Sequence, residues 1–247
     1  MEVSLPLPSH VRRRVMEFLL ESSLQLPAPP IVKYTALSFF TDRFLPSLPC
    51  FLQRNTGRLN WLLNPLRESN LQLFALVSIW ISSKIHDTRP LSIKSLKSLG
   101  DNVIVDQHFT TRDFAEAELV FMEVFRFDIG ASKVAYGFLE DLLIQFRELS
   151  RVGDLVSLDL CTHIMDLLYE TEETSKLLLS PHSLAASVLV TAYLLSVPKQ
   201  QWEFPVLPWV KSITSYEEQD IGEMVIKILK HILSPEMAIQ GITRAAS

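Results

Sequence analysis

Two long apolar runs constrain the fold of this chain more than any other feature. They are residues 73–81 (LFALVSIWI) and residues 184–197 (LAASVLVTAYLLSV). Both fall short of the ~18 apolar residues that identify a membrane-spanning helix. A helix that is apolar nearly all round has to be covered by other helices on every side. We therefore predict two helical bundles, each built around one of these runs.

The remaining periodicity places further helices around the two central ones. In the first half, helices are expected over residues 10–26, 32–45, 69–89, 92–99 and 110–127. In the second half they are expected over residues 134–149, 155–168, 181–197, 206–213 and 217–233. Proline and glycine at the boundaries support these limits, and residues 46–67, with several prolines, are expected to form a long surface connection.

The predicted fold class is therefore all-α, with two consecutive five-helix bundles in the same helix order. Few residues are identical between the halves, so the repeat is one of burial pattern. The bundles correspond to domains at residues 1–130 and 131–247, the second ending in a short tail, and residues 131–133 are the expected link.

Composition limits the classes of function that the chain can serve. Hydrophobic residues make up 48% and glycine only 7 of 247 residues, which is typical of packed helices. The formal charge of −5 argues against a protein that mainly neutralises nucleic-acid phosphates or anionic membranes. Cys50 and Cys161 are too few for a disulfide framework. We expect a soluble intracellular protein without a secretory signal, and neither a nucleic-acid nor a membrane partner.

Catalytic motifs are missing from the sequence. The glycines never cluster, so there is no phosphate-cradling loop and no nucleophile elbow. Cys161 and His163, two residues apart on a helix, point in different directions and cannot hold one metal ion. Glu170, Glu172 and Glu173 have no histidine or basic residue beside them and are interpreted as a solvated helix end. We predict no catalytic residue, no metal, no cofactor and no enzymatic activity.

Three segments nevertheless form a pattern. They are residues 37–45 (LSFFTDRFL), 76–90 (LVSIWISSKIHDTRP) and 114–129 (FAEAELVFMEVFRFDI). Together they resemble the cyclin box, and their order, spacing and position on the second, third and fifth helices match the first repeat of the cyclin family. The second half resembles the cyclin C-terminal repeat. Length and a short N-terminus make the chain most similar to the small J-type cyclins of plants.

The resemblance implies roles for particular residues. Lys84 in SSKIHD matches the cyclin lysine at the end of the third helix, and Glu118 in AEAEL matches the glutamate early in the fifth. In cyclins these two residues hold the C-helix region of a kinase inward. The apolar kinase-contact surface around them matches Ile81, Ile85, Met122, Phe127 and Ile129.

Two further assignments follow from the same resemblance. Asp42 resembles the aspartate that pairs with a buried arginine of the first helix, and its partner is either Arg12 or Arg13. The residues matching the substrate-docking groove are Val11, Val15, Phe18 and Gln72. Arg14 stands where an aliphatic residue is expected, which puts docking of the usual arginine-x-leucine motif in question.

The implied function is that of a regulatory, non-catalytic subunit that binds a cyclin-dependent serine/threonine kinase and activates it in cell-cycle control. Substrates and inhibitors of the kinase are further candidate partners, and the expected location is the nucleus and cytoplasm. One alternative is a helical transcription adaptor of the same double-repeat architecture, against which the net charge of −5 speaks. Another is a helical scaffold without a kinase partner.

Overall fold

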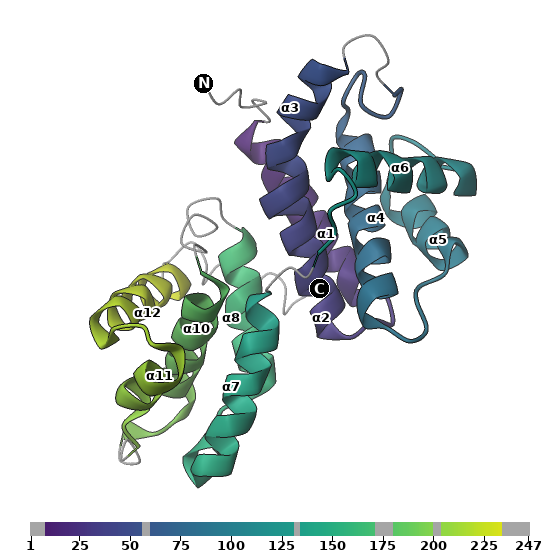
Figure 1. The fold of residues 1–247 in the computed structure, drawn as a ribbon. Coiled ribbons are helices and arrows are strands. Elements are labelled where there is room, and N and C mark those ends of the chain that lie inside the picture. The colour runs from purple at the N-terminus through teal and green to yellow at the C-terminus, as the bar shows by residue number, and fades with distance from the viewer. Residues whose placement is uncertain (1–7, 56–59, 131–133, 171–179, 200–203, 234–247) are drawn as a thin grey trace. The chain divides into compact units, whose positions relative to one another are not determined.

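The chain folds into two helical units. The computed structural model describes residues 8–55, 60–130, 134–170, 180–199 and 204–233, and all regular secondary structure in these ranges is helical. The chain divides into a first unit, Met1–Ser132, and a second unit, Lys133–Ser247 (Figure 1). The prediction of an all-α chain with two consecutive bundles is confirmed. The expected link at residues 131–133 lies outside the described residues.

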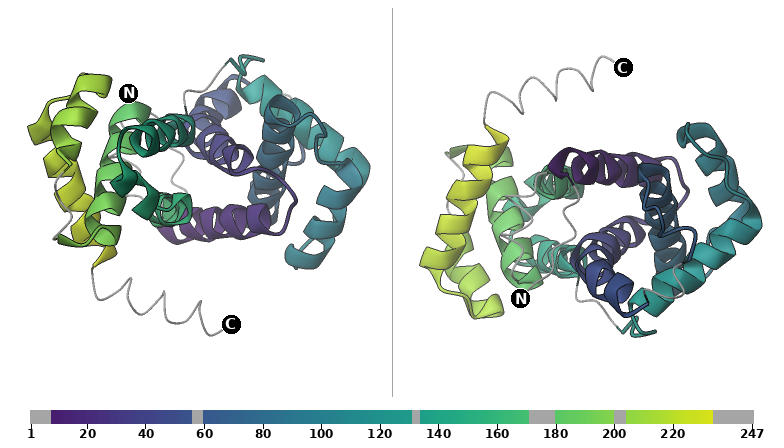
Figure 2. Two further views of the ribbon diagram at one scale, coloured as in Figure 1. Left: turned by 90° about the horizontal axis from the view of Figure 1, so that it is seen from below. Right: turned by 90° about the horizontal axis from the view of Figure 1, so that it is seen from above.

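The first unit is arranged around α4 (Glu68–His86), the helix that contains the first apolar run. Its other elements are α1 (Ser9–Leu24), α2 (Pro30–Ser38), η1 (Phe39–Phe44), α3 (Leu45–Arg54), α5 (Ile93–Val103) and α6 (Thr111–Val124). Helix α4 contacts α1, α2, η1, α5 and α6, and the two views of Figure 2 show these neighbours around it. Burial of side chains on all faces of α4 explains why the run is apolar throughout.

The segment from Phe39 to Arg54 differs from the prediction. The second helix continues through a π-helical segment, η1, into α3, so residues 46–54 of the expected surface connection at residues 46–67 are helical. Pro46 lies in the first turn of α3, where a missing N–H is tolerated. Leu48 and Leu62 are fully buried. The prediction of a surface connection is wrong for residues 46–54, because Pro46 stands where α3 begins and α3 also accommodates Pro49.

Helix α6 has a well-defined beginning. The Thr110 hydroxyl accepts a hydrogen bond from the Asp113 N–H, and the Asp113 carboxylate accepts one from the Thr110 N–H. This capping box satisfies two N–H groups that would otherwise lack a partner at the helix start. Phe114, Phe121 and Val124 then point into the core, where Phe121 stacks on Phe44 with ring centroids 4.6 Å apart. The opposite face of α6 remains at the surface.

The second unit is arranged around α10 (Pro181–Ser196), which contains the second apolar run. Its other elements are α7 (Ala135–Leu149), η2 (Arg151–Leu155), α8 (Leu158–Glu170), α11 (Val206–Thr214) and α12 (Glu218–Ile232). Helix α10 contacts all of them. Five of these elements lie where helices were predicted, whereas the short 3-10 helix η2 was not predicted.

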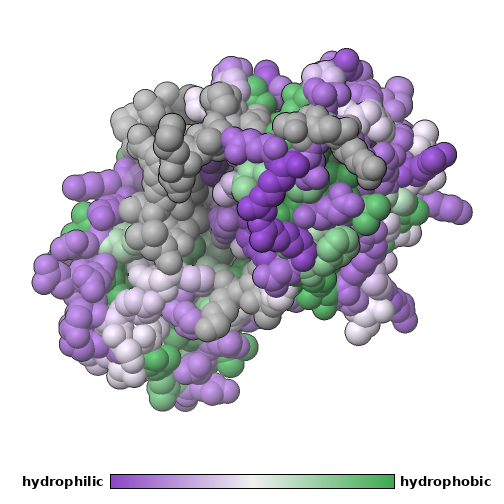
Figure 3. Space-filling model, turned by 45° about the horizontal axis from the view of Figure 1, so that its top comes forward, coloured by the Kyte–Doolittle hydropathy of each residue, from purple (hydrophilic) through white to green (hydrophobic). Residues whose placement is uncertain are grey.

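The surface of the described chain is mixed in character. Figure 3 shows hydrophobic residues in patches among hydrophilic ones on the face that it displays. No described helix has the length and apolar character needed to cross a membrane.

Candidate functional site

Lys84 and Glu118 form an ion pair between two neighbouring helices. Lys84 lies in the last turn of α4, Glu118 lies in α6, and the two helices pack together. The Lys84 Nζ donates a hydrogen bond to Glu118 Oε1 at 2.5 Å. The two side chains remain 38% and 27% exposed. Because solvent screens such a pair, it contributes only ~0–1 kcal/mol to folding, and both groups can be reached by another molecule.

Trp80 fixes the position of the lysine. The Lys84 Nζ lies 3.6 Å from the centroid of the Trp80 ring, one helical turn earlier on α4. The indole N–H donates to the Leu91 carbonyl at 3.0 Å, so the ring cannot rotate freely. A cation over a tryptophan face is attracted by the ring quadrupole. Sequence reasoning missed this role, although the four-residue spacing of a tryptophan and a lysine on a helix is a usable signal.

The predicted apolar contact residues have unequal exposure. Ile85 follows Lys84 directly and is 45% exposed, while Phe127 is 59% exposed. Met122, one turn beyond Glu118, and Ile129 are half-buried. Ile81 is buried in the core. The structure therefore places four of the five residues at the surface and gives Ile81 a core position beneath it.

The turn after α6 has an unusual backbone. Arg126 and Phe127 have φ values of 52° and 59°, in the left-handed region that residues other than glycine seldom adopt. The Phe127 N–H donates to the Met122 carbonyl at 2.8 Å, which closes the end of the helix. Each such residue stores strain of ~1–3 kcal/mol and persists only where the surroundings enforce it. Strained backbone of this kind is found most often at functional sites. Here the strained turn places the side chain of Phe127 at the surface.

Arg43 of η1 supports that turn. Its guanidinium donates to the Asp128 carbonyl and lies 3.7 Å from the Asp128 carboxylate. It also lies over the Phe125 ring, 4.6 Å from the centroid. Sequence reasoning cited the neighbouring Asp42 but not Arg43, because nothing in the sequence connects two positions 85 residues apart.

Asp42 is positioned by its own helix and by α1. The Thr41 hydroxyl donates to its carboxylate at 2.9 Å. Surrounding protein atoms raise the pKa of Asp42 by desolvation even though solvent reaches the residue, while hydrogen bonds from Thr41 and Ser38 and the charge of Arg12 oppose that rise. Of the two candidate arginines, Arg12 is the one whose charge acts on Asp42, and Arg13 pairs with Glu17 at 2.9 Å.

The residues matched to a docking groove lie on α1 and α4. Val15 and Phe18 are buried in the core of the first unit, whereas Val11 and Gln72 are half-buried. Arg14 pairs with Glu68 of α4 at the surface. Val15 and Phe18 thus offer little side-chain area to a peptide, and docking here stays a prediction.

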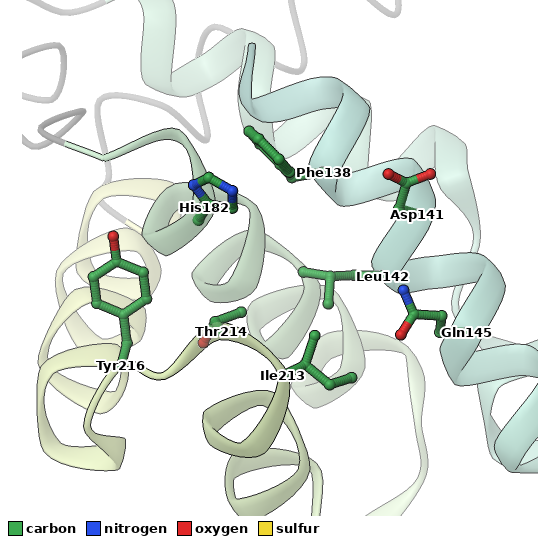
Figure 4. A pocket seen from close by; sticks show the side chains of 8 residues that line it. All are labelled: Phe138, Asp141, Leu142, Gln145, His182, Ile213, Thr214 and Tyr216. Carbon is green, nitrogen blue, oxygen red and sulfur yellow. The ribbon is translucent and has the colours of Figure 1, made fainter. Parts of the chain in front are cut away.

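The second unit contains a pocket that sequence reasoning did not anticipate. It has a volume of about 300 Å³ and is lined by Phe138, Asp141, Leu142, Gln145, His182, Ile213, Thr214 and Tyr216. Figure 4 shows Asp141 and Gln145 on α7, across the hollow from Tyr216. The His182 ring packs on Phe138, with centroids 3.5 Å apart. In the described part of the chain no hydrogen bond joins Asp141 to His182, so the pocket shows no acid–base pair.

The two residues considered for metal binding, Cys161 and His163, differ in exposure. Cys161 is buried, and desolvation raises the pKa of its thiol to about 12, while His163 on the same helix is exposed. Within residues 8–55, 60–130, 134–170, 180–199 and 204–233, no three histidine, cysteine or acidic side chains gather closely enough to hold a metal ion. Glu172 and Glu173 lie outside these ranges.

Comparison with known proteins connects this geometry to a family. Residues 2–130 match the family model described as "Cyclin, N-terminal domain". The chain is 58% identical over 236 residues to a "Cyclin-J18-like" protein of Oryza sativa subsp. japonica, covering 94% of this chain and 90% of the relative. It is 57% identical over 224 residues to "Cyclin-J18" of Arabidopsis thaliana, covering 91% and 95% respectively.

A solved structure shows the same fold. The X-ray structure of a viral cyclin from Herpesvirus saimiri aligns with a TM-score of 0.60 and 17% sequence identity, over 90% of this chain and 85% of that one. At this level of identity the likeness concerns the fold alone. The family model and the two plant relatives carry the assignment: the chain belongs to the cyclin family, and within it to the J-type cyclins of plants.

Proposed function

We propose that this cyclin is a non-catalytic regulatory subunit that binds a cyclin-dependent serine/threonine kinase through the surface around Lys84 and Glu118. We call this the clamp surface; it consists of Lys84, Glu118, Ile85, Met122, Phe127 and Ile129. The observation that carries the proposal is the ion pair at 2.5 Å between residues 34 positions apart, beside exposed apolar side chains. Packing of the core needs neither charge at these positions.

The chemistry of the clamp surface suits the end of a helix in a partner. A helix end leaves backbone N–H and C=O groups without partners, and burying them against an apolar surface is unfavourable unless they are hydrogen-bonded. An ammonium donates to carbonyls and a carboxylate accepts from N–H groups. Lys84 and Glu118 supply one of each, while Ile85 and Phe127 supply the apolar area in which binding energy concentrates.

Binding of this kind activates a kinase by shifting a population. A protein kinase is active when the lysine of its third strand pairs with the glutamate of its C-helix. A subunit that binds only the helix-in state favours that state. Moving the equilibrium from about 1:99 to about 99:1 needs ~5.5 kcal/mol of differential binding. Exposed apolar side chains beside two charged groups are the kind of surface that supplies binding energy of this order.

Lys84→Ala and Glu118→Ala test the proposal. We expect each to weaken kinase binding by ~2–5 kcal/mol, mainly because polar groups of the partner are left unpaired. The matched control is Lys97→Ala, which removes another partly exposed ion pair of the same unit, that with Asp101. All three variants should stay folded, since such exposed pairs contribute ~0–1 kcal/mol to stability.

Two measurements decide the outcome. Co-purification with each cyclin-dependent kinase of the source plant measures binding, and phosphate transfer by the kinase with and without added cyclin measures activation. The proposal predicts that wild type and the Lys97 variant bind and activate one kinase, and that the two clamp variants do neither. Full binding by folded clamp variants would disprove the assignment of the site.

Two further parts of the proposal depend on this kinase. Substrates or inhibitors of the kinase would meet the complex at a second surface, for which Val11 and Gln72 on the half-buried rim of α1 and α4 are the candidates. A regulatory subunit of a cell-cycle kinase is expected in the nucleus and cytoplasm, which a fluorescent fusion expressed from the native promoter tests.

A further inference from the structure

The first unit contains a second feature that the clamp surface does not use, a pocket lined by arginines. It has a volume of about 360 Å³ and lies between the side of α3 and the C-terminal end of α6, which come together in Figure 1. Its lining includes Arg43, Arg54, Arg126, Glu123, Phe51 and Cys50. We call it the arginine pocket.

The arginine pocket is positively charged, whereas the chain as a whole is negatively charged. Three guanidiniums and the Glu123 carboxylate line the hollow, and the Asp128 carboxylate lies 3.7 Å from Arg43, so the local balance is 3 − 2 = +1 in a protein whose formal charge is −5. In the described residues neither Arg54 nor Arg126 makes a side-chain hydrogen bond or ion pair. Two guanidiniums without an ion-pair partner, those of Arg54 and Arg126, therefore line the same hollow, and this arrangement is suited to an anion.

The arginines differ in how firmly they are placed. Arg43 is fixed by the Phe125 ring and the Asp128 carbonyl. Arg126 lines the pocket from a backbone with a φ of 52°, a conformation that glycine or asparagine would adopt with less strain. A basic residue after a helix also complements the helix dipole. That effect alone needs neither a strained backbone nor a hollow shared with a second helix.

We propose that the arginine pocket binds the phosphate group of a phosphorylated serine or threonine on a partner protein. Arginine guanidiniums are matched to phosphate because they donate paired, charge-assisted hydrogen bonds. The hollow has an apolar wall at Phe51, which can take a neighbouring peptide side chain. Nucleic acid is disfavoured because it needs an extended basic surface, which a chain of charge −5 does not favour.

The choice of a protein as the carrier of the phosphate rests in part on the proposed function. Arg126 directly precedes Phe127 of the clamp surface, so a kinase or kinase-bound protein seated there would pass close to the pocket. The test below measures binding without any kinase. Failure of the pocket would thus leave the clamp surface untouched, and failure of kinase binding would leave the pocket to be judged on its own.

The experiment is a titration of the full-length, isotope-labelled chain followed by amide NMR signals. The probe is the capped peptide Gly-Ala-phosphothreonine-Ala-Gly, with the unphosphorylated peptide and inorganic phosphate as separate arms. We expect the phosphopeptide to cause saturable shifts of amide signals in α3 and in the turn after α6. The unphosphorylated peptide and inorganic phosphate should cause smaller shifts or none. Binding of the phosphopeptide should weaken as the salt concentration rises.

Arg54→Gln and Arg126→Asn are the test variants, the second chosen because asparagine tolerates the left-handed backbone. Each should weaken phosphopeptide binding by about tenfold or more, as expected for losing a charge-assisted hydrogen bond. Arg112→Gln is the control, since it removes an exposed arginine from the opposite end of α6. If Arg126→Asn does not fold, Arg54→Gln alone decides.

Four outcomes of the peptide titrations would overturn the proposal. They are no saturable shift with the phosphopeptide, equal binding of the unphosphorylated peptide, unchanged binding by folded Arg54→Gln, and an effect of Arg112→Gln as large as that of the test variants. Tighter binding of inorganic phosphate than of the phosphopeptide would also overturn it, because the ligand would then be the free ion.

Discussion

Cys50 and Cys161 carry the same thiol in opposite surroundings. Cys50 is exposed on α3, whereas Cys161 is buried in the second unit, where desolvation raises the pKa of its thiol to about 12. Burial makes Cys161 unreactive for two reasons: a reagent cannot reach the thiol, and the raised pKa keeps it from ionising to the reactive thiolate. At the scale of the residue, the burial of a cysteine therefore determines the reactivity of its thiol, which the sequence alone does not reveal.

The first residue-scale prediction concerns these thiols. In the folded Cys50→Ser variant, Cys161 should react with a disulfide reagent at neutral pH only at the rate at which the chain unfolds. The Cys161→Ser variant should react at once through Cys50. The check is absorbance of the released thiol with and without denaturant. Immediate reaction of folded Cys50→Ser would show that Cys161 is accessible.

The second residue-scale prediction concerns His86 at the end of α4. Its Nε2 is 2.9 Å from the Thr35 hydroxyl of α2, and desolvation lowers its pKa below the ordinary 6.5. Because the unfolded chain binds this proton more readily, the stability contributed by neutral His86 is present above about pH 6.5 and is lost as pH falls through the folded-state pKa.

His86→Gln should therefore flatten the loss of stability on acidification. The measurement is the free energy of unfolding by urea at a series of pH values on both sides of the ordinary histidine pKa. Other groups also titrate, so the comparison is between the slopes of wild type and variant. Equal slopes would mean that His86 does not contribute to the pH dependence.

At the scale of the element, two glycines show how local packing determines the effect of an added methyl group on stability. Gly153 in η2 approaches the α7 backbone so closely that a Cβ would lie 2.9 Å from the N and Cα of Arg147. Gly222, inside α12, has no atom within 4 Å of the same position. One glycine is required by a close approach, and the other only weakens a helix.

Alanine substitution at the two positions should have opposite effects. Gly153→Ala should lower the free energy of unfolding by ~1–3 kcal/mol through overpacking. Gly222→Ala should raise it by ~0.5–1 kcal/mol, because alanine is the better helix former and restricts the unfolded chain. Denaturant titration of the two variants against wild type is the check. A loss of stability from Gly222→Ala would contradict the helical assignment there.

The elements of this fold were predictable to different degrees. The central helices α4 and α10 were placed correctly, because a helix that is apolar on all faces is stable only where other helices cover it on every side. The prediction of a surface connection was wrong for residues 46–54, because periodicity cannot distinguish a proline that ends a helix from one that begins the next. At the site, Lys84 and Glu118 were proposed from motif resemblance. Trp80 was missed although its spacing from Lys84 is a usable signal, whereas Arg43 acts through a contact that only the folded chain reveals.

At the scale of the whole molecule, the clamp surface and the arginine pocket are built entirely from the first unit. The second unit has its own core around α10, in which Leu189 is fully buried. We therefore expect the stability of the second core to be separable from the proposed recognition of a kinase by the first unit, so that a single substitution can address one of them.

Leu189→Ala should lower the free energy of unfolding of the second unit by ~2–5 kcal/mol, from lost apolar burial and the cavity left behind. Under conditions in which the variant is folded, its affinity for the kinase should stay within twofold of wild type. Differential scanning calorimetry measures the first effect, and the co-purification assay for Lys84 the second. A large loss of kinase binding would show that the second unit takes part in recognition.

The π-helical segment η1 lets two consecutive residues serve different partners, with Asp42 influenced by Arg12 of α1 and Arg43 bonded to Asp128 beyond α6. A π turn contains one residue more than an α turn, and such insertions occur often at functional sites. Deleting one residue from it would restore ordinary helical spacing but rotate everything that follows by ~100° relative to what precedes it. The Arg43 contact that supports the turn carrying Phe127 therefore depends on the helical winding of a segment 85 residues earlier in the chain.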